Sequence, residues 1–202
     1  FYAKDKAGNI SRTYFLYLDT VKPEGAIKGM AGTTYIGKYI NQTFSYTATD
    51  SGSGISYLQY KKPGSSSWLT YTSGTSISAS AASGTYQFRA VDKAGNISAT
   101  KSITLDSSKP TMTLYSGDVS VSNGYKSIAN YIKATATDSG SGVKTIYVKK
   151  PSASSYTEYA SGTQLTADGA YSFYCVDNAG NASQTYTISM DHTRPTITSS
   201  VG

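Results

Sequence analysis

The phrase FRAVDKAGNIS, from Phe88 to Ser98, occurs three times in this chain with small changes. It stands at the start as FYAKDKAGNIS, Phe1–Ser11, and returns near the end as FYCVDNAGNAS, Phe173–Ser183. Each copy joins a run of alternating apolar and polar residues to a short segment that contains Gly and Asn. This combination is typical of a strand that ends in a tight turn.

The residues around the middle copy alternate strictly between apolar and polar. Tyr86, Phe88 and Ala90 would share one face of an extended chain, and Gln87 and Arg89 the other. A period of two with one apolar face predicts a half-buried antiparallel strand. About seven such runs, separated by Gly- and Ser-containing turns, occur in each repeat. The sequence therefore predicts an all-β fold of tandem immunoglobulin-like antiparallel β-sandwiches.

The length of the repeat indicates one domain per copy. Pro23, Pro110 and Pro195 follow the three copies of the phrase at intervals of 87 and 85 residues. Solenoid repeats are shorter, roughly 20–50 residues, whereas this period suits an independent domain. Because residue 1 falls inside the repeated pattern, we expect a piece of a longer tandem array. The expected parts are the last two strands of a preceding module at 1–21, modules at 22–108 and 109–194, and the start of a following module at 195–202.

The segments between the expected modules are short and contain proline. They are LDTVKP, LDSSKP and MDHTRP. Proline fixes its own φ and favours an extended conformation in the residue before it. We therefore expect the last strand of one module to run almost straight into the next, as a semi-rigid spacer whose main partners are neighbouring immunoglobulin-like modules in the same chain.

The repeated phrase contains the residues of a closed turn. Glycine can adopt positive φ, and an aspartate beside the turn can accept backbone N–H groups. We expect the phrase to fix the hairpin between the last two strands of each module. The predicted turn residues are Asp5, Gly8 and Asn9; Asp92, Gly95 and Asn96; and Asp177, Gly180 and Asn181.

A calcium site is the alternative role for these aspartates. Asp50 and Asp92, together with Asp19 or Asp106 near the module ends, carry ligand atoms of the right type. Calcium takes about six to eight oxygens, however, and each module has few acidic residues in a chain of net charge +6. The sequence therefore favours the turn role without any cofactor, and leaves calcium at Asp50, Asp92 and Asp106 as the alternative.

Composition argues against several other classes of function. The 18 Lys and Arg residues are scattered and form no nucleic-acid motif, and no apolar run approaches the roughly 18 residues of a membrane helix. The single cysteine, Cys175, matches Ala3 and Ala90 and is expected to be an inert core thiol. With His192 as the only histidine, neither a His–Cys zinc site nor a nucleophile–base pair can be assembled. We therefore expect no enzyme activity, no nucleic-acid partner and no membrane segment.

The pattern Tyr-x-Phe-x-Ala-x-Asp-x-Ala-Gly-Asn-x-Ser, followed by Leu-Asp-x-x-x-Pro, resembles the bacterial immunoglobulin-like (Big-type) repeats of large secreted and cell-wall-attached proteins. The segment DSGSGISYLQY, Asp50–Tyr60, shares the resemblance. It implies an extracellular location, on the bacterial surface or secreted, and no catalytic residue. Such modules serve as adhesin spacers, as accessory domains or as binding domains. We expect a non-catalytic spacer.

Exposed aromatic residues suggest the alternative of a glycan- or host-ligand-binding module. Residues at positions i and i+3 of a strand lie on opposite faces, so one of each aromatic pair can be exposed and stack on a sugar ring. Nearby lysines would suit an anionic glycan or cell-wall polymer, although they can equally protect an edge strand from pairing. The candidate ligand-binding residues are Trp68, Tyr71, Tyr156, Tyr159, Lys61 and Lys149.

Overall fold

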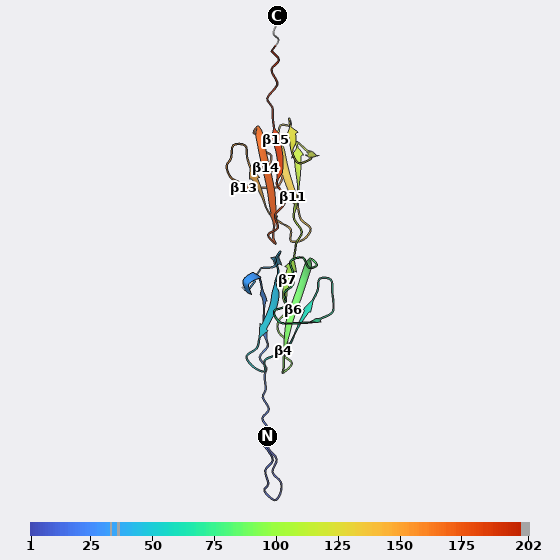
Figure 1. Ribbon diagram of the computed structural model, residues 1–202, viewed down its shortest axis with the longest axis vertical. Coiled ribbons are helices and arrows are strands. Elements are labelled where there is room, and N and C mark those ends of the chain that lie inside the picture. Colours follow the sequence, from blue (N-terminus) through green and yellow to red (C-terminus); the bar gives the residue numbers. More distant parts are fainter. Residues whose placement is uncertain (33, 36, 199–202) are drawn as a thin grey trace. The chain divides into compact units, whose positions relative to one another are not determined.

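A computed structural model describes residues 1–32, 34–35 and 37–198. Over these residues the chain is almost entirely β-structure, with one short 3-10 helix, η1 (Met30–Gly32), and no α-helix. The described chain has no helix of the length and apolar character that crossing a membrane requires. The predicted fold class, all-β with immunoglobulin-like antiparallel β-sandwiches, is confirmed (Figure 1).

The chain divides into two compact units. The first comprises residues 1–36, 43–78 and 85–103, and the second comprises 37–42, 79–84 and 104–202. These units do not coincide with the two sandwiches, which are defined below by their sheets.

The first sandwich contains strands β1 to β7 in two sheets. In the smaller sheet, β1 (Glu24–Lys28) pairs antiparallel with β3 (Ser45–Thr49). The larger sheet has five strands, in the order β2 (Tyr39–Ile40), β7 (Lys101–Leu105), β6 (Gly84–Asp92), β4 (Ile55–Lys61) and β5 (Leu69–Tyr71).

The second sandwich repeats this plan with strands β8 to β15. Its smaller sheet has the order β11 (Ile132–Thr137), β8 (Thr111–Ser116) and β9 (Val119–Val121). Its larger sheet has the order β10 (Tyr125–Ser127), β15 (Tyr186–Met190), β14 (Gly169–Asp177), β12 (Val143–Lys149) and β13 (Thr157–Tyr159).

The alternating residues of the strands make the cores, as the period of two predicts. Phe88 and Ala90 of β6 are fully buried, while Arg89 between them is only partly buried. In the second sandwich, Phe173 of β14 and Ile132 of β11 belong to one buried cluster, so the inner faces of both sheets form a single core. Cys175 is part of this cluster, and its burial raises the pKa of the thiol. A neutral, inaccessible thiol is chemically inert.

Two local features differ from the sequence-based expectation. The run Ser76–Ala79, one of the seven runs that suggest strands in the first repeat, forms no named strand; Ile77 makes an isolated antiparallel bridge to Phe44. Strand β2 was not predicted, and it pairs in parallel with β7. A two-residue strand is too short to show a period of two in the sequence. Its place in the sheet depends instead on backbone hydrogen bonds, such as that from the Asp106 N–H to the Ile40 carbonyl at 2.9 Å.

The residues outside the sandwiches form little regular structure. Within 1–21, Lys4 and Ile10 make an antiparallel bridge, and Tyr14 donates its N–H to the carbonyl of Phe1 at 2.8 Å. Of the expected following module, residues 195–198 carry no strand, and residues 199–202 lie outside the described residues.

Candidate functional site

The repeated phrase folds into a turn closed by an aspartate–asparagine pair. Asn96 donates its backbone N–H to Asp92 Oδ1 and its side-chain amide to Asp92 Oδ2, both at 2.8 Å. Asn181 makes the same two bonds to Asp177, also at 2.8 Å each. The glycine before each asparagine has a positive φ, +95° at Gly95, which a residue with a Cβ rarely adopts. The first copy, around Asp5 and Asn9, has the same geometry.

The asparagine also binds the backbone of the segment that leads into the sandwich. We call residues 19–23 and 106–110 the leading segments, because they precede β1 and β8. Asn96 Nδ2 donates to the carbonyls of Asp19, at 3.0 Å, and Val21, at 3.2 Å. Asn181 Nδ2 donates to the carbonyl of Asp106 at 2.9 Å. One amide group thus holds both the turn and the leading segment.

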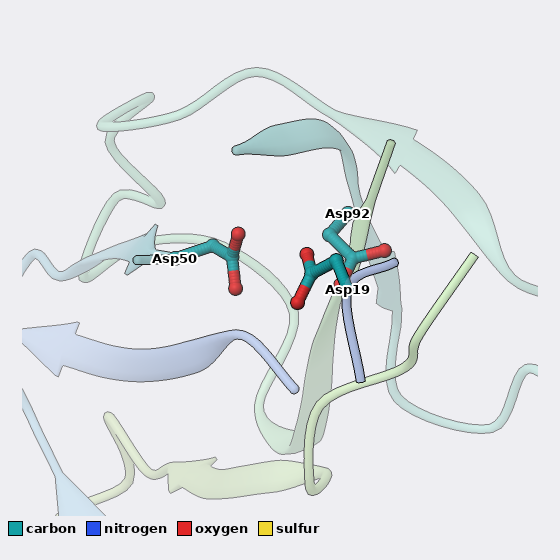
Figure 2. A group of neighbouring side chains, drawn as sticks. All are labelled: Asp19, Asp50 and Asp92. Carbon is teal, nitrogen blue, oxygen red and sulfur yellow. The ribbon is translucent and has the colours of Figure 1, made fainter. Parts of the chain in front are cut away.

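Three aspartates meet beside this turn in the first sandwich. Asp19 comes from the leading segment, Asp50 directly follows β3, and Asp92 ends β6. One carboxylate oxygen of each lies within 4.8 Å of those of the other two. Figure 2 shows Asp50 facing Asp19 and Asp92 across a small gap. We call this group the first aspartate trio.

The second sandwich contains an equivalent group, the second aspartate trio. Asp106 precedes β8, Asp138 directly follows β11 and Asp177 ends β14, with the same limit of 4.8 Å between their oxygens. The structure corrects the sequence-based grouping, because Asp106 joins this trio and not Asp50 and Asp92. Asp138 was missed, although it has the same place in its ATDSGSG segment as Asp50 has in the other copy.

Hydrogen bonds hold the carboxylates in place. Asp50 Oδ2 accepts the N–H groups of Gly52, at 3.0 Å, and Gly54, at 2.7 Å. Asp19 Oδ2 accepts the N–H of Ser53 at 2.6 Å, and hydrogen bonds from Ser53 lower the pKa of Asp19.

The second trio is held in the same way. Asp138 Oδ2 accepts the N–H groups of Gly140 and Gly142, and Asp106 Oδ2 accepts that of Ser141 at 2.6 Å. Burial alone would raise the pKa of Asp106, but hydrogen bonds from Ser141 and Ser108 outweigh it, so the pKa is lowered. The leading aspartates of both trios are therefore ionised at neutral pH.

The trios concentrate negative charge in poorly solvated places. Asp92, Asp106 and Asp177 are 2%, 1% and 0% exposed. At an effective dielectric constant of about 20, two unit charges about 5 Å apart repel by roughly 3 kcal/mol. In the part of the chain that the structure describes, no Lys, Arg or His side chain forms an ion pair with any trio aspartate. Among the described residues, no direct ion pair thus neutralises the trio carboxylates.

A glycine lets each leading aspartate approach the loop. A Cβ on Gly52 would lie 2.3 Å from Asp19 Oδ1, and one on Gly140 would lie 2.4 Å from the Asp106 carboxylate. Both distances are below any real Cβ contact. The third residue of each DSGSG loop must therefore lack a side chain if the leading aspartate is to occupy this position.

Two of the candidate ligand-binding aromatics are buried instead of exposed. Tyr71 is 6% exposed and Tyr159 is 8% exposed. The Tyr71 hydroxyl accepts the N–H of Tyr46 and donates to the carbonyl of Thr75. The Tyr159 hydroxyl accepts the N–H of Ala134, at 3.1 Å, and donates to a carbonyl four residues on. The prediction that their rings could stack on a sugar is wrong, because both rings point into the core.

The remaining four candidates lie on the outer faces of the larger sheets. Trp68 is partly buried, with Lys61 Nζ 4.8 Å and Arg89 Cζ 4.2 Å from its ring centre. Such cation–π contacts cover part of the ring.

In the second sandwich, Tyr156 packs edge-on against Tyr174 at 4.9 Å, and Tyr174 stacks on Tyr147. Lys149 Nζ lies 5.9 Å from the Tyr156 ring centre. Each sandwich thus has an outer aromatic side chain with a lysine beside it, Trp68 in the first and Tyr156, within a cluster of tyrosines, in the second.

His192 is a further residue whose role was not predicted from the sequence. Its ring bonds to the Asp168 carboxylate and to the carbonyl of Ala129, and the bond to Asp168 raises the pKa of His192. The signal in the sequence was weak, because the matching positions hold Thr20 and Ser107.

No protein-family model matches the sequence, and no curated protein matches it either. Solved structures do match, among them fibronectin(III)-like modules of Clostridium thermocellum CbhA. That structure is 17% identical, the match covers 81% of this chain and 92% of that one, and the TM-score is 0.37.

Proposed function

We propose that this chain is a non-catalytic, spacer-type segment of a bacterial surface or secreted multidomain protein, as in an adhesin stalk. The observation that carries the proposal is the double role of Asn96 and Asn181. The amide that closes the turn also binds carbonyls of the leading segment. A segment held in this way cannot swivel freely where it enters the sandwich, which is a property that a spacer needs.

The sequence supports the same role. The leading segments contain a proline at 23 and 110, which further restricts their backbone. The phrase that provides the asparagine is repeated, so each module would carry its own clamp. A function that depends on repetition and on restricted segments is mechanical and needs no catalytic residue.

A glycan-binding role is the second candidate, and the outer aromatic side chains Trp68 and Tyr156 favour it. Trp68 with Lys61, and Tyr156 with Lys149, lie at matching positions of the two sandwiches. Aromatic faces next to cations suit an anionic polysaccharide. The contacts that these rings already make within the protein weigh against this role.

Hydrogen exchange tests the spacer role. Val21 N–H bonds to Asp19 Oδ1 at 2.9 Å within the leading segment, so it reports how firmly the segment is held. Asn96→Ala should speed exchange at Val21. The matched control is Asn9→Ala, which breaks the same kind of turn in the first copy of the phrase and should leave Val21 unchanged. Unchanged exchange at Val21 in Asn96→Ala would remove the basis of the proposal.

The fluorescence of Trp68 tests the second candidate, since Trp68 is the only tryptophan in the chain. A saturable change with a host or cell-wall polysaccharide, lost in Lys61→Ala, would replace the spacer role by a binding role. A pull-down on the same panel extends the test to the Tyr156 cluster.

A further inference from the structure

We infer that each aspartate trio is a calcium site: Asp19, Asp50 and Asp92 in the first sandwich, and Asp106, Asp138 and Asp177 in the second. This inference does not depend on the spacer proposal, because a binding module could use the same ions.

Unpartnered buried oxygens provide the first argument. Asp50 Oδ1 and Asp138 Oδ1 each expose less than 1 Å² and have no hydrogen-bond partner. Each belongs to a trio whose carboxylate oxygens converge. Buried carboxylate oxygens are almost always satisfied, since leaving one without a partner is costly. The same atom is unpartnered in both sandwiches, which indicates a shared missing partner at the centre of each trio.

The charge of each trio favours a cation as this partner. Each trio holds three carboxylates, and within the described residues no Lys, Arg or His pairs with any of them. A bound cation satisfies the free oxygen and balances the charge at the same time.

The type of ligand selects calcium. All the ligand atoms in the trios are carboxylate oxygens, which hard cations prefer, whereas zinc favours His and Cys. Each carboxylate oxygen has two acceptor sites, so an oxygen that accepts an N–H can still bind a metal. Each trio offers three converging carboxylate oxygens, and backbone carbonyls or water would supply the rest of the roughly six to eight oxygens that calcium takes in a flexible geometry. Magnesium demands a stricter octahedron and keeps several waters, so it should bind more weakly.

The ion would tie three parts of each sandwich together. One ligand comes from the leading segment, one from the loop after β3 or β11, and one from the end of β6 or β14. Calcium would therefore hold the leading segment against the sandwich at the same place as the Asn96 or Asn181 amide.

Calorimetric titration of the metal-free chain with calcium chloride tests the inference. We expect two calcium ions per chain, and weaker binding or none with magnesium chloride. Asp50→Asn should remove one site, Asp138→Asn the other, and the double variant both. Asp5→Asn is the matched control, because Asp5 has the place of Asp92 in the repeated phrase but is exposed and belongs to no trio among the described residues. It should keep both sites.

A measurement on the unmodified chain guards against variants that fold poorly. In a calcium titration followed by NMR, the amides of Gly52, Gly54, Gly140 and Gly142 should shift most, because they donate to the trio carboxylates. Absence of saturable binding at about 10 mM calcium, well above the dissociation constants of extracellular calcium modules, would overturn the inference. So would two-site binding that survives in the double variant.

Discussion

Gly25 of β1 lies directly under the hydroxyl of Tyr46 of β3, so that a Cβ at residue 25 would lie 1.8 Å from Tyr46 Oη. In the second sandwich the large and the small residue are exchanged between the two strands. Met112 stands in the place of Gly25, and Ala134 in the place of Tyr46. In both sandwiches a large residue on one strand is matched by a small one on its neighbour.

Gly25→Met should therefore destabilise the first sandwich unless Tyr46 is also reduced in size. The single change forces overpacking, which typically costs about 1–3 kcal/mol. Gly25→Met combined with Tyr46→Ala recreates the pair of the second sandwich. The double variant should lose less unfolding free energy than the two single variants lose in sum. A double-mutant cycle by urea unfolding measures this coupling, and additive effects would contradict it.

Ser152→Gly should stabilise the second sandwich. Ser152 has φ +62°, and the matching residue of the first sandwich is Gly64, with φ +73°. A residue with a Cβ pays a steric cost of about 1–2 kcal/mol in this conformation, part of which the greater chain entropy of glycine offsets. We expect a gain of roughly 0.5–1 kcal/mol in the unfolding free energy, and a loss of similar size for Gly64→Ser. Denaturation midpoints of both variants check the prediction, and equal midpoints would contradict it.

His192 should titrate above its ordinary pKa of about 6.5. Its bond to Asp168 favours the charged ring, and the Ala129 carbonyl adds to this effect. Because the folded-state pKa is the higher one, the stabilisation is fully present below about pH 6.5 and is lost as the pH rises through the folded-state pKa. NMR titration of the ring protons checks the direction. Asp168→Asn should lower the pKa of His192, and an unchanged titration would exclude the pairing.

Tyr159→Phe should destabilise the second sandwich by about 1–3 kcal/mol. The change leaves the N–H of Ala134 without its acceptor inside a buried strand. Tyr125→Phe is the matched control, because Tyr125 is 42% exposed. Thermal or urea unfolding should separate the two variants. Equal stability would mean that the Tyr159 hydroxyl contributes nothing to the fold.

The fold class could be predicted from the sequence because the deciding information is local. The alternation of Tyr86, Phe88 and Ala90 with polar residues determines which face of β6 is buried. Short strands such as β2 could not be predicted, because two residues show no period and their pairing comes from distant backbone groups.

The sequence by itself determined the repeat, the all-β fold and the residue types at the two candidate sites. Local patterns are sufficient for these, since periodicity and turn chemistry act over a few residues. Only the tertiary structure decided which aspartates belong together. Asp19, Asp50 and Asp92 are distant in the chain, and they meet because a leading segment, a loop and a strand end converge beside one sandwich. It likewise decided that Tyr71 and Tyr159 belong to the core, because burial depends on which sheet face meets the opposite sheet and not on the residue type.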